Sequence, residues 1–289
     1  MAAKAYTEEL VQIQAADGVE LAGAVIRPTA GAVRPLPVVW VHGFTGRFYE
    51  PTALGIGRRL AERGHVFVTG NNRGDNYGTV LHVRATGEGR LGGAAWERLD
   101  EAPLDVDAWV GFAVGLGFPR VALLGHSLGG MKVVYYMATR QDTRVAGLIV
   151  ASGPVWRFVG PAKEAVEREA EAERLVAEGR GLELLLPFPA AGATTVSAQT
   201  VVSGRPLRAA LFGHDGRRPA VALVRCPVFA FLGSEEAWLG TPADLEWLKA
   251  TAAAAPRCET RVFAGADHVY SGHEAEVADA VADWVQTLT

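Results

Sequence analysis

Residues 121–137 read Val-Ala-Leu-Leu-Gly-His-Ser-Leu-Gly-Gly-Met-Lys-Val-Val-Tyr-Tyr-Met, and this stretch is the strongest indication of the fold class. Its centre, Gly125-His-Ser-Leu-Gly129, matches the pattern G-x-S-x-G, in which glycines permit a sharp turn from a strand into a helix and expose the serine hydroxyl. The pentapeptide is weak evidence alone, so its flanks matter. Val121–Leu124 has the apolar run of a buried strand, and Met131–Ala138 suits a buried helix. Together they predict a nucleophilic Ser127 on a strand–turn–helix elbow.

Outward from the elbow, short apolar runs alternate with segments of helical periodicity. An alternation of this kind predicts parallel strands joined by crossover helices, with helices on both faces of the sheet. Earlier in the chain, Asp17-Gly18 between two strand-like runs predicts an antiparallel hairpin. The fold class is therefore α/β, with a mostly parallel sheet. The expected strands are Leu10–Gln14, Leu21–Arg27, Val38–Val41, His65–Thr69, Val145–Val150, Val228–Leu232 and Arg261–Phe263, and the expected helices are Ala53–Arg63, Asp105–Val114 and Glu274–Leu288.

A long interruption separates the strand at residues 145–150 from the next one at 228–232. It begins with a charged helical stretch, Ala162–Glu178, and continues into sequence broken by glycine and proline. We interpret residues 155–220 as an inserted cap and residues 1–154 with 221–289 as one α/β core. A charged helix is equally typical of a solvated surface, so its individual charges predict no ligand role.

Composition restricts the class of partner. The 289 residues carry a net charge of −4, without a basic stripe, and include 49% hydrophobic residues. This balance favours a globular protein that binds a small molecule, and it argues against nucleic acid or membrane partners. Cys226 and Cys258 lack metal-ligand spacing, and we expect reduced thiols, no cofactor and a cytoplasmic monomer or homodimer.

A serine hydroxyl needs a base within hydrogen-bonding reach, and seven histidines are present. Only His268 follows the last expected strand and precedes the C-terminal helix, where the base should lie. His273 falls at the helix start and fits a capping or exposed residue better than a catalytic one. Among the other histidines besides His42, we expect His126 to pack against its neighbours, His65 to have a structural role, and His82 and His214 to lie in loops.

The base in turn needs an orienting carboxylate, expected after the strand at residues 228–232. The chain offers Glu235 and Glu236 there. We favour Glu236 because it lies three residues past Gly233, where a fold with this kind of elbow commonly places its acid. Glu235 remains the alternative, and the carboxylate that is not used is expected to face solvent.

Acyl transfer also needs N–H donors for the oxyanion. One donor comes from the residue after the nucleophile and the other from a loop after an early strand. These donors would be the backbone amides of Leu128 and Phe44, the second within His42-Gly43-Phe44. The alternative interpretation is that residues 42–44 form an ordinary glycine-containing loop after a strand, with no role in catalysis.

These motifs, in the order Ser, acid, His, resemble the α/β-hydrolase superfamily over nearly the whole chain. The stretches Gly92–Arg98, Asp105–Trp109 and Gly125–Tyr136 are similar to a branch that includes fungal siderophore ester hydrolases. The resemblance implies hydrolysis of a carboxylic ester without a cofactor or metal, with Ser127 as nucleophile, His268 as base and the same two amides as donors. Glu236 departs from the aspartate that is commoner in the family.

Three classes of function fit these residues. A carboxylesterase is favoured, an amidase, peptidase or lactonase with the same triad is the alternative, and a ligand-binding protein of the same fold is the third, because fold alone does not define function. Apolar residues near the elbow and in the insertion predict a small to medium, partly apolar substrate. Besides Phe44, the candidate substrate-binding residues, each of which could instead belong to the core, are Trp156, Phe158, Leu184, Leu185, Phe188 and Trp238.

Overall fold

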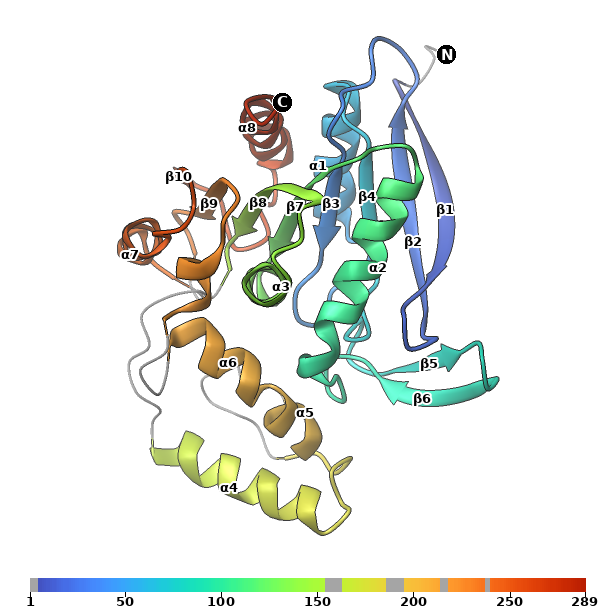
Figure 1. Cartoon of the computed structure of the whole chain (residues 1–289), viewed down its shortest axis with the longest axis vertical. Helices are drawn as coiled ribbons and strands as arrows, with labels where there is room; N and C mark the ends of the chain where they lie inside the picture. Colours follow the sequence, from blue (N-terminus) through green and yellow to red (C-terminus); the bar gives the residue numbers. More distant parts are fainter. Residues whose placement is uncertain (1–4, 154–162, 186–194, 214–217, 237–239) are drawn as a thin grey trace.

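The computed structural model describes residues 5–153, 163–185, 195–213, 218–236 and 240–289. Within them, eight strands form one sheet in the order β1-β2-β4-β3-β7-β8-β9-β10 (Figure 1). Pairing is antiparallel for β1 with β2 and β2 with β4, and parallel from β4 to β10. The bounds are β1 Tyr6–Gln14, β2 Glu20–Pro28, β3 Val38–Val41, β4 Phe67–Gly70, β7 Val121–His126, β8 Val145–Ala151, β9 Val228–Gly233 and β10 Cys258–Phe263.

This topology confirms the predicted α/β class, the parallel sheet and the opening hairpin. The hairpin turns at Gly18, whose φ of 87° lies in the left-handed region that glycine adopts readily. Strands β3, β4, β8 and β9 are buried along their whole length, as continuous apolar runs predict. Strand β4 begins at Phe67 and not at His65, since the His65 backbone N–H donates to the Leu60 carbonyl of the preceding helical segment at 3.0 Å.

Helices cover both faces of the sheet. On one face lie α1 (Pro51–Glu62) and α8 (Glu274–Gln286), and on the other lie α2 (Ala102–Gly115), α3 (Leu128–Arg140) and α7 (Pro242–Thr251) (Figure 1). Helix α2 packs closely because two strand positions are glycines: a Cβ on Gly23 or Gly70 would come within 2.4 or 1.9 Å of the Trp109 ring. The Trp109 indole N–H donates to the Asn71 carbonyl at 2.8 Å, which ties α2 to the chain leaving β4.

Between β8 and β9 the chain carries α4 (Lys163–Ala177), α5 (Ala198–Ser203) and α6 (Arg205–Phe212), which Figure 1 shows at one end of the molecule. Helix α4 matches the predicted charged helix, whereas α5 and α6 lie in sequence expected to be broken. They pack on other elements: Ser197 N–H donates to the Ala95 carbonyl at 2.7 Å, and Leu99 N–H donates to Ser203 Oγ at 3.1 Å. Tertiary contacts thus support helices that are too short to form alone.

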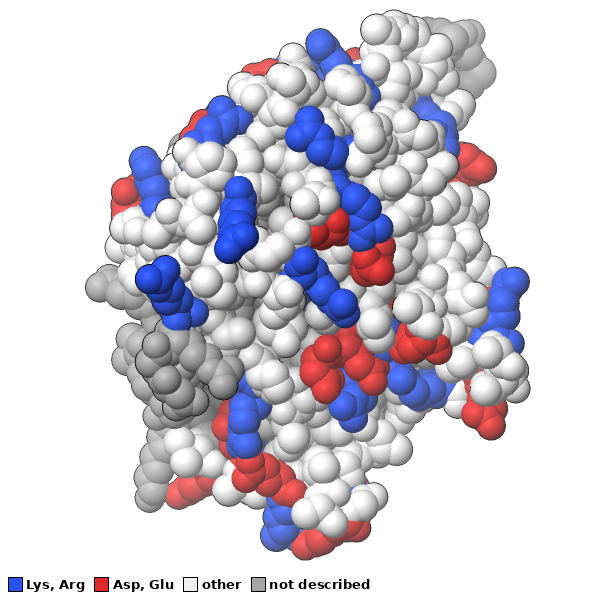
Figure 2. Space-filling view, in the orientation of Figure 1, with Lys and Arg blue, Asp and Glu red and all other residues white. Residues whose placement is uncertain are grey.

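Three further elements were not predicted: α7 and the hairpin of β5 (Thr79–Val83) with β6 (Glu88–Gly92). Most β5 and β6 residues are exposed or half-buried, so no apolar alternation marks them. His82 lies in β5 and not in a loop, which corrects the expectation for that residue. On the face shown in Figure 2, uncharged surface separates many of the basic side chains, and acidic side chains adjoin others.

Candidate active site

The elbow forms as predicted between β7 and α3. Ser127 has φ 55° and ψ −127°, a combination that costs free energy for any residue with a side chain and that recurs at functional sites. The close glycines explain how the turn fits: a Cβ on Gly125 would lie 2.3 Å from the Gly129 carbonyl oxygen, and one on Gly129 would lie 2.1 Å from that of Val41. The Ser127 N–H donates to the Ala151 carbonyl at 2.9 Å, which holds the elbow against β8.

The structure brings His268 and Glu236 together from the chains that leave β10 and β9. His268 Nδ1 lies 2.7 Å from Glu236 Oε2, and the carboxylate side chain is only 1% exposed. Because a carboxylate only accepts, Nδ1 carries the proton, and in the neutral imidazole Nε2 is then a free acceptor. Glu235, the alternative, is exposed, and its carboxylate accepts from Ser234 Oγ at 3.3 Å.

His126 links the elbow to the His268 loop, a role that the expectation of packing missed. Its Nε2 lies 2.9 Å from the His268 carbonyl oxygen, its ring centre is 5.0 Å from that of His268, and it stacks on Trp40. Burial, with the nearby His268 ring, lowers the pKa of His126 to about 4. The neutral ring therefore donates from Nε2, which ties the residue before Ser127 to the backbone of the candidate base.

Tyr270 holds the same loop against the end of β8, and no sequence pattern predicted this role. It is fully buried with φ 62°, and its hydroxyl lies 2.8 Å from Ser152 Oγ at the end of β8. Ser152 also has a left-handed φ of 44°. Strained residues of this kind persist where the surroundings over-determine them. The ends of β7, β8, β9 and β10 thus all contact the loop that carries His268.

The loop after β3 closes on the serine from the other side. A Cβ on Gly43 would lie 2.6 Å from Ser127 Cβ and 3.1 Å from Ser127 Oγ, so only glycine allows this approach. The Phe44 N–H follows directly in the chain, and in the described residues no backbone carbonyl accepts it. Leu128 begins α3, where the first N–H groups have no partner within the helix. Leu128 thus follows Ser127 directly, and the residue before Phe44 lies against the serine.

The remaining predicted substrate-binding residues are only partly described. Leu184 is exposed, and Leu185 is buried in a small apolar cluster with Leu175 and Ala198, within the segment between β8 and β9. The others, Trp156, Phe158, Phe188 and Trp238, lie outside the described residues, as does His214. His273 is the residue before α8, and its Nδ1 lies 3.4 Å from Glu276 Oε2.

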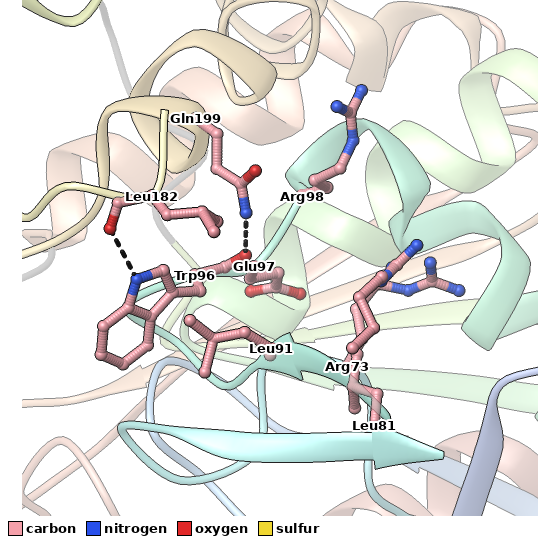
Figure 3. Close-up of a pocket in the computed structure, with 10 residues that line it drawn as sticks. Arg73, Leu81, Leu91, Trp96, Glu97, Arg98, Leu182 and Gln199 are labelled. Carbon is pink, nitrogen blue, oxygen red and sulfur yellow. Dashed lines mark hydrogen bonds between the residues drawn. The ribbon is translucent and has the colours of Figure 1, made fainter. Parts of the chain in front are cut away.

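A cavity of about 120 Å³ lies between the β5–β6 hairpin, the chain at residues 96–98 and the segment between β8 and β9 (Figure 3). That segment closes one side, since Trp96 Nε1 donates to the Leu182 carbonyl and Gln199 Nε2 to the Trp96 carbonyl, both at 2.9 Å. Neither Ser127 nor His268 lines this cavity. The lining residues are Arg73, Leu81, Arg90, Leu91, Gly92, Trp96, Glu97, Arg98, Leu182 and Gln199.

Other kinds of site find no support among the described residues. They contain no group of three or more His, Cys, Asp or Glu side chains arranged to hold a metal ion. None of the helices that the structure describes is long and apolar enough to cross a membrane. Cys226 and Cys258 are free, and burial raises the pKa of each thiol to about 11.

Comparison with known proteins agrees with the elbow and sheet. Residues 38–284 match the model of the alpha/beta hydrolase family, and the chain belongs to this family. No curated protein sequence matches it significantly.

Solved structures share the fold at low identity. The esterase Est1E of Butyrivibrio proteoclasticus, solved with ferulic acid bound, is 19% identical with a TM-score of 0.67 over 96% of this chain and 99% of its own. The Pyrococcus furiosus esterase Pf2001 is 16% identical with a TM-score of 0.61 over 98% and 93%. The alpha/beta hydrolase GrgF of a Penicillium species is 16% identical with a TM-score of 0.65 over 98% of each chain. The protein is a hydrolase with esterases among its structural neighbours.

Proposed function

We propose that the protein is a carboxylesterase that cleaves its substrate through an acyl-enzyme on Ser127. The hydrogen bond of 2.7 Å between His268 Nδ1 and the buried Glu236 carboxylate carries this proposal. It holds the imidazole in the tautomer whose Nε2 can accept the serine proton, which a serine nucleophile requires at neutral pH. The strained elbow at Ser127 adds support, because it places the serine where β7 ends, at the same ends of the parallel strands from which the His268 and Glu236 loops leave.

In the proposed reaction, Ser127 Oγ attacks the ester carbonyl carbon while His268 accepts its proton. The resulting oxyanion accepts hydrogen bonds from the Phe44 and Leu128 N–H groups. His268 then returns the proton to the departing alcohol, and the acyl group stays on Ser127. Water, deprotonated by the same imidazole, then attacks the acyl carbon. The bond to Ser127 Oγ breaks, His268 returns the proton to Oγ, and the carboxylic acid leaves. Glu236 stabilises the imidazolium formed in each step without itself taking the proton.

The substrate class follows from the apolar character of the predicted pocket. We propose a small to medium, partly apolar ester, with residues 155–220 acting as a cap over the site, in a cytoplasmic protein that works without a cofactor, nucleic acid or membrane. The neighbour Est1E was solved with ferulic acid bound, and at 19% identity this likeness supports the fold and not a particular ester.

The test is a panel of p-nitrophenyl esters, amides and lactones, combined with fluorophosphonate labelling and mass spectrometry of the labelled peptide. We expect ester turnover and a single label on Ser127. Turnover of amides alone would refute the ester assignment. A protein that neither turns over any substrate nor takes the label would refute the serine mechanism.

A further inference from the structure

Behind the loop that holds Phe44 lies a line of buried polar side chains that the proposed reaction does not use. Its members are Glu97, Lys132, Asn72 and His42, each at most 3% exposed. They come from separate places in the fold: the chain before α2, helix α3, and the exits of β4 and β3. Each polar group buried away from water costs free energy unless it is hydrogen-bonded, so the partners of each one matter.

The line begins at the ion pair of Lys132 and Glu97. Lys132 Nζ also donates to Asn72 Oδ1 at 3.0 Å, and the Gly74 N–H donates to the same oxygen at 3.0 Å. Because two donors occupy Oδ1, the amide can have only one orientation, with its NH₂ group on the opposite side. There Asn72 Nδ2 donates to the His42 carbonyl at 3.3 Å.

Asn72 also sets the protonation of the His42 ring. Its backbone N–H donates to His42 Nε2 at 3.0 Å, so the proton of the neutral ring is on Nδ1, which lies 2.9 Å from the Gly43 carbonyl oxygen. Burial, together with the charge of Lys132, lowers the pKa of His42 to about 3 and keeps the ring neutral. The His42 ring therefore donates to the Gly43 carbonyl.

The hydrogen bond from the His42 ring to the Gly43 carbonyl affects the direction of the Phe44 N–H, one of the two proposed oxyanion donors. The Gly43 carbonyl and the Phe44 N–H belong to one planar trans peptide, in which they point in opposite directions. Holding the carbonyl on the His42 side therefore directs the Phe44 N–H away from it. The position of Gly43 against Ser127 leaves the peptide little room to rotate.

A buried ion pair is a poor stabiliser, since well-packed apolar residues of similar volume are often as good or better. In this protein Glu97 pairs with Lys132, and Lys132 is one of the two donors that fix the orientation of the Asn72 amide. We propose that Lys132 and Glu97 are positioning residues that act through Asn72 and His42 to aim the Phe44 N–H at the oxyanion. The proposal rests on the esterase function proposed above.

The test replaces the ion pair by apolar residues in a Lys132→Met, Glu97→Leu double variant. Tyr136→Phe is the matched control, because Tyr136 is a buried polar residue of the same helix whose hydroxyl bonds Asp107 at 3.2 Å and Asp142, outside this line. Three quantities are measured: the melting temperature, kcat and KM for a p-nitrophenyl ester, and the inhibition constant of a trifluoromethyl ketone. The ketone forms a hemiketal oxyanion on the serine, so its affinity reports the oxyanion site directly.

We expect the double variant to fold, with kcat lower by about tenfold to a hundredfold, part of the about 10²–10³ that loss of a whole donor costs. KM should stay within about threefold, and the ketone should bind more weakly by the same factor as kcat/KM falls. The control should match the parent in all three. If the double variant does not fold, Asn72→Asp gives the same test, because it sets an oxygen against the His42 carbonyl in place of the NH₂ group.

Two results would overturn the inference while leaving the esterase intact. One is a folded variant with kcat/KM within about threefold of the parent, and the other is a loss of kcat with unchanged affinity for the ketone. A parent protein that fluorophosphonate does not label at Ser127 would instead refute the proposed function, and the inference would fail with it.

Discussion

Replacing Glu236 by glutamine tests the candidate triad with the smallest change of shape. The substitution keeps the size of the side chain and removes its charge at the point where Oε2 lies 2.7 Å from His268 Nδ1. Glu235, the residue before Glu236 in the chain, is exposed and provides a matched control. Both side chains leave the same loop after β9, so general damage to the loop should affect both variants.

The magnitude follows from the charge that is lost. At about 4 Å between charge centres and an effective dielectric constant of about 20, a carboxylate stabilises an imidazolium by about 4 kcal/mol. Loss of that stabilisation in the transition state lowers kcat about 10³-fold. Glutamine can also donate its NH₂ group to Nδ1, which forces the proton of His268 onto Nε2, the wrong tautomer for accepting the serine proton. We expect a loss of at least about a hundredfold in kcat for Glu236→Gln and a change of at most a few fold for Glu235→Gln.

The assay is steady-state kinetics of both variants with the best p-nitrophenyl ester, with circular dichroism to verify that both are folded. If Glu235→Gln were the impaired variant, the roles of the two glutamates would be the reverse of our assignment. If neither were impaired, the acid would come from another strand and the triad as proposed would be wrong.

The other predictions concern the nucleophile, metals and pH. Ser127→Ala should lower ester turnover by several orders of magnitude and leave the melting temperature close to that of the parent; an unchanged kcat would exclude Ser127 as the nucleophile. Treatment with EDTA should not change kcat, and a loss that zinc or manganese restores would contradict this. The free energy of unfolding should fall as pH decreases from about 6.5 to 4, because the half-buried His126, with a pKa lowered to about 4, binds its proton less readily in the folded protein than in the unfolded chain. Chemical denaturation should therefore show that the free energy of unfolding of His126→Gln depends less on pH than that of the parent. Over this range the decrease should be smaller by up to about 3 kcal/mol in the variant; equal decreases in both proteins would contradict the prediction.

The sequence predicted those parts of the fold that local patterns encode. Continuous apolar runs marked the buried parallel strands, and Asp17-Gly18 marked the first hairpin. The β5–β6 hairpin and helices α5 and α6 were missed for the opposite reason. Their residues are half-exposed or belong to short helices, and contacts such as Ser197 with Ala95 stabilise them only after the chain has folded.

Local sequence was enough to predict the elbow at Ser127, since glycines at fixed spacing around a serine, between a buried strand and a buried helix, permit the sharp turn. It also narrowed the candidates for the base to one histidine and those for the acid to two adjacent glutamates. Which of these glutamates contacts His268 is known only from the folded chain, because neighbouring residues in a loop point in different directions and the loop packs against another strand end. The same holds for the line from Lys132 to His42, whose members lie up to 90 positions apart in the chain (132 − 42) and meet only when sheet and helices assemble. Each of these polar groups finds its hydrogen-bond partner only when distant segments pack together, so residue spacing along the chain does not predict the pairing.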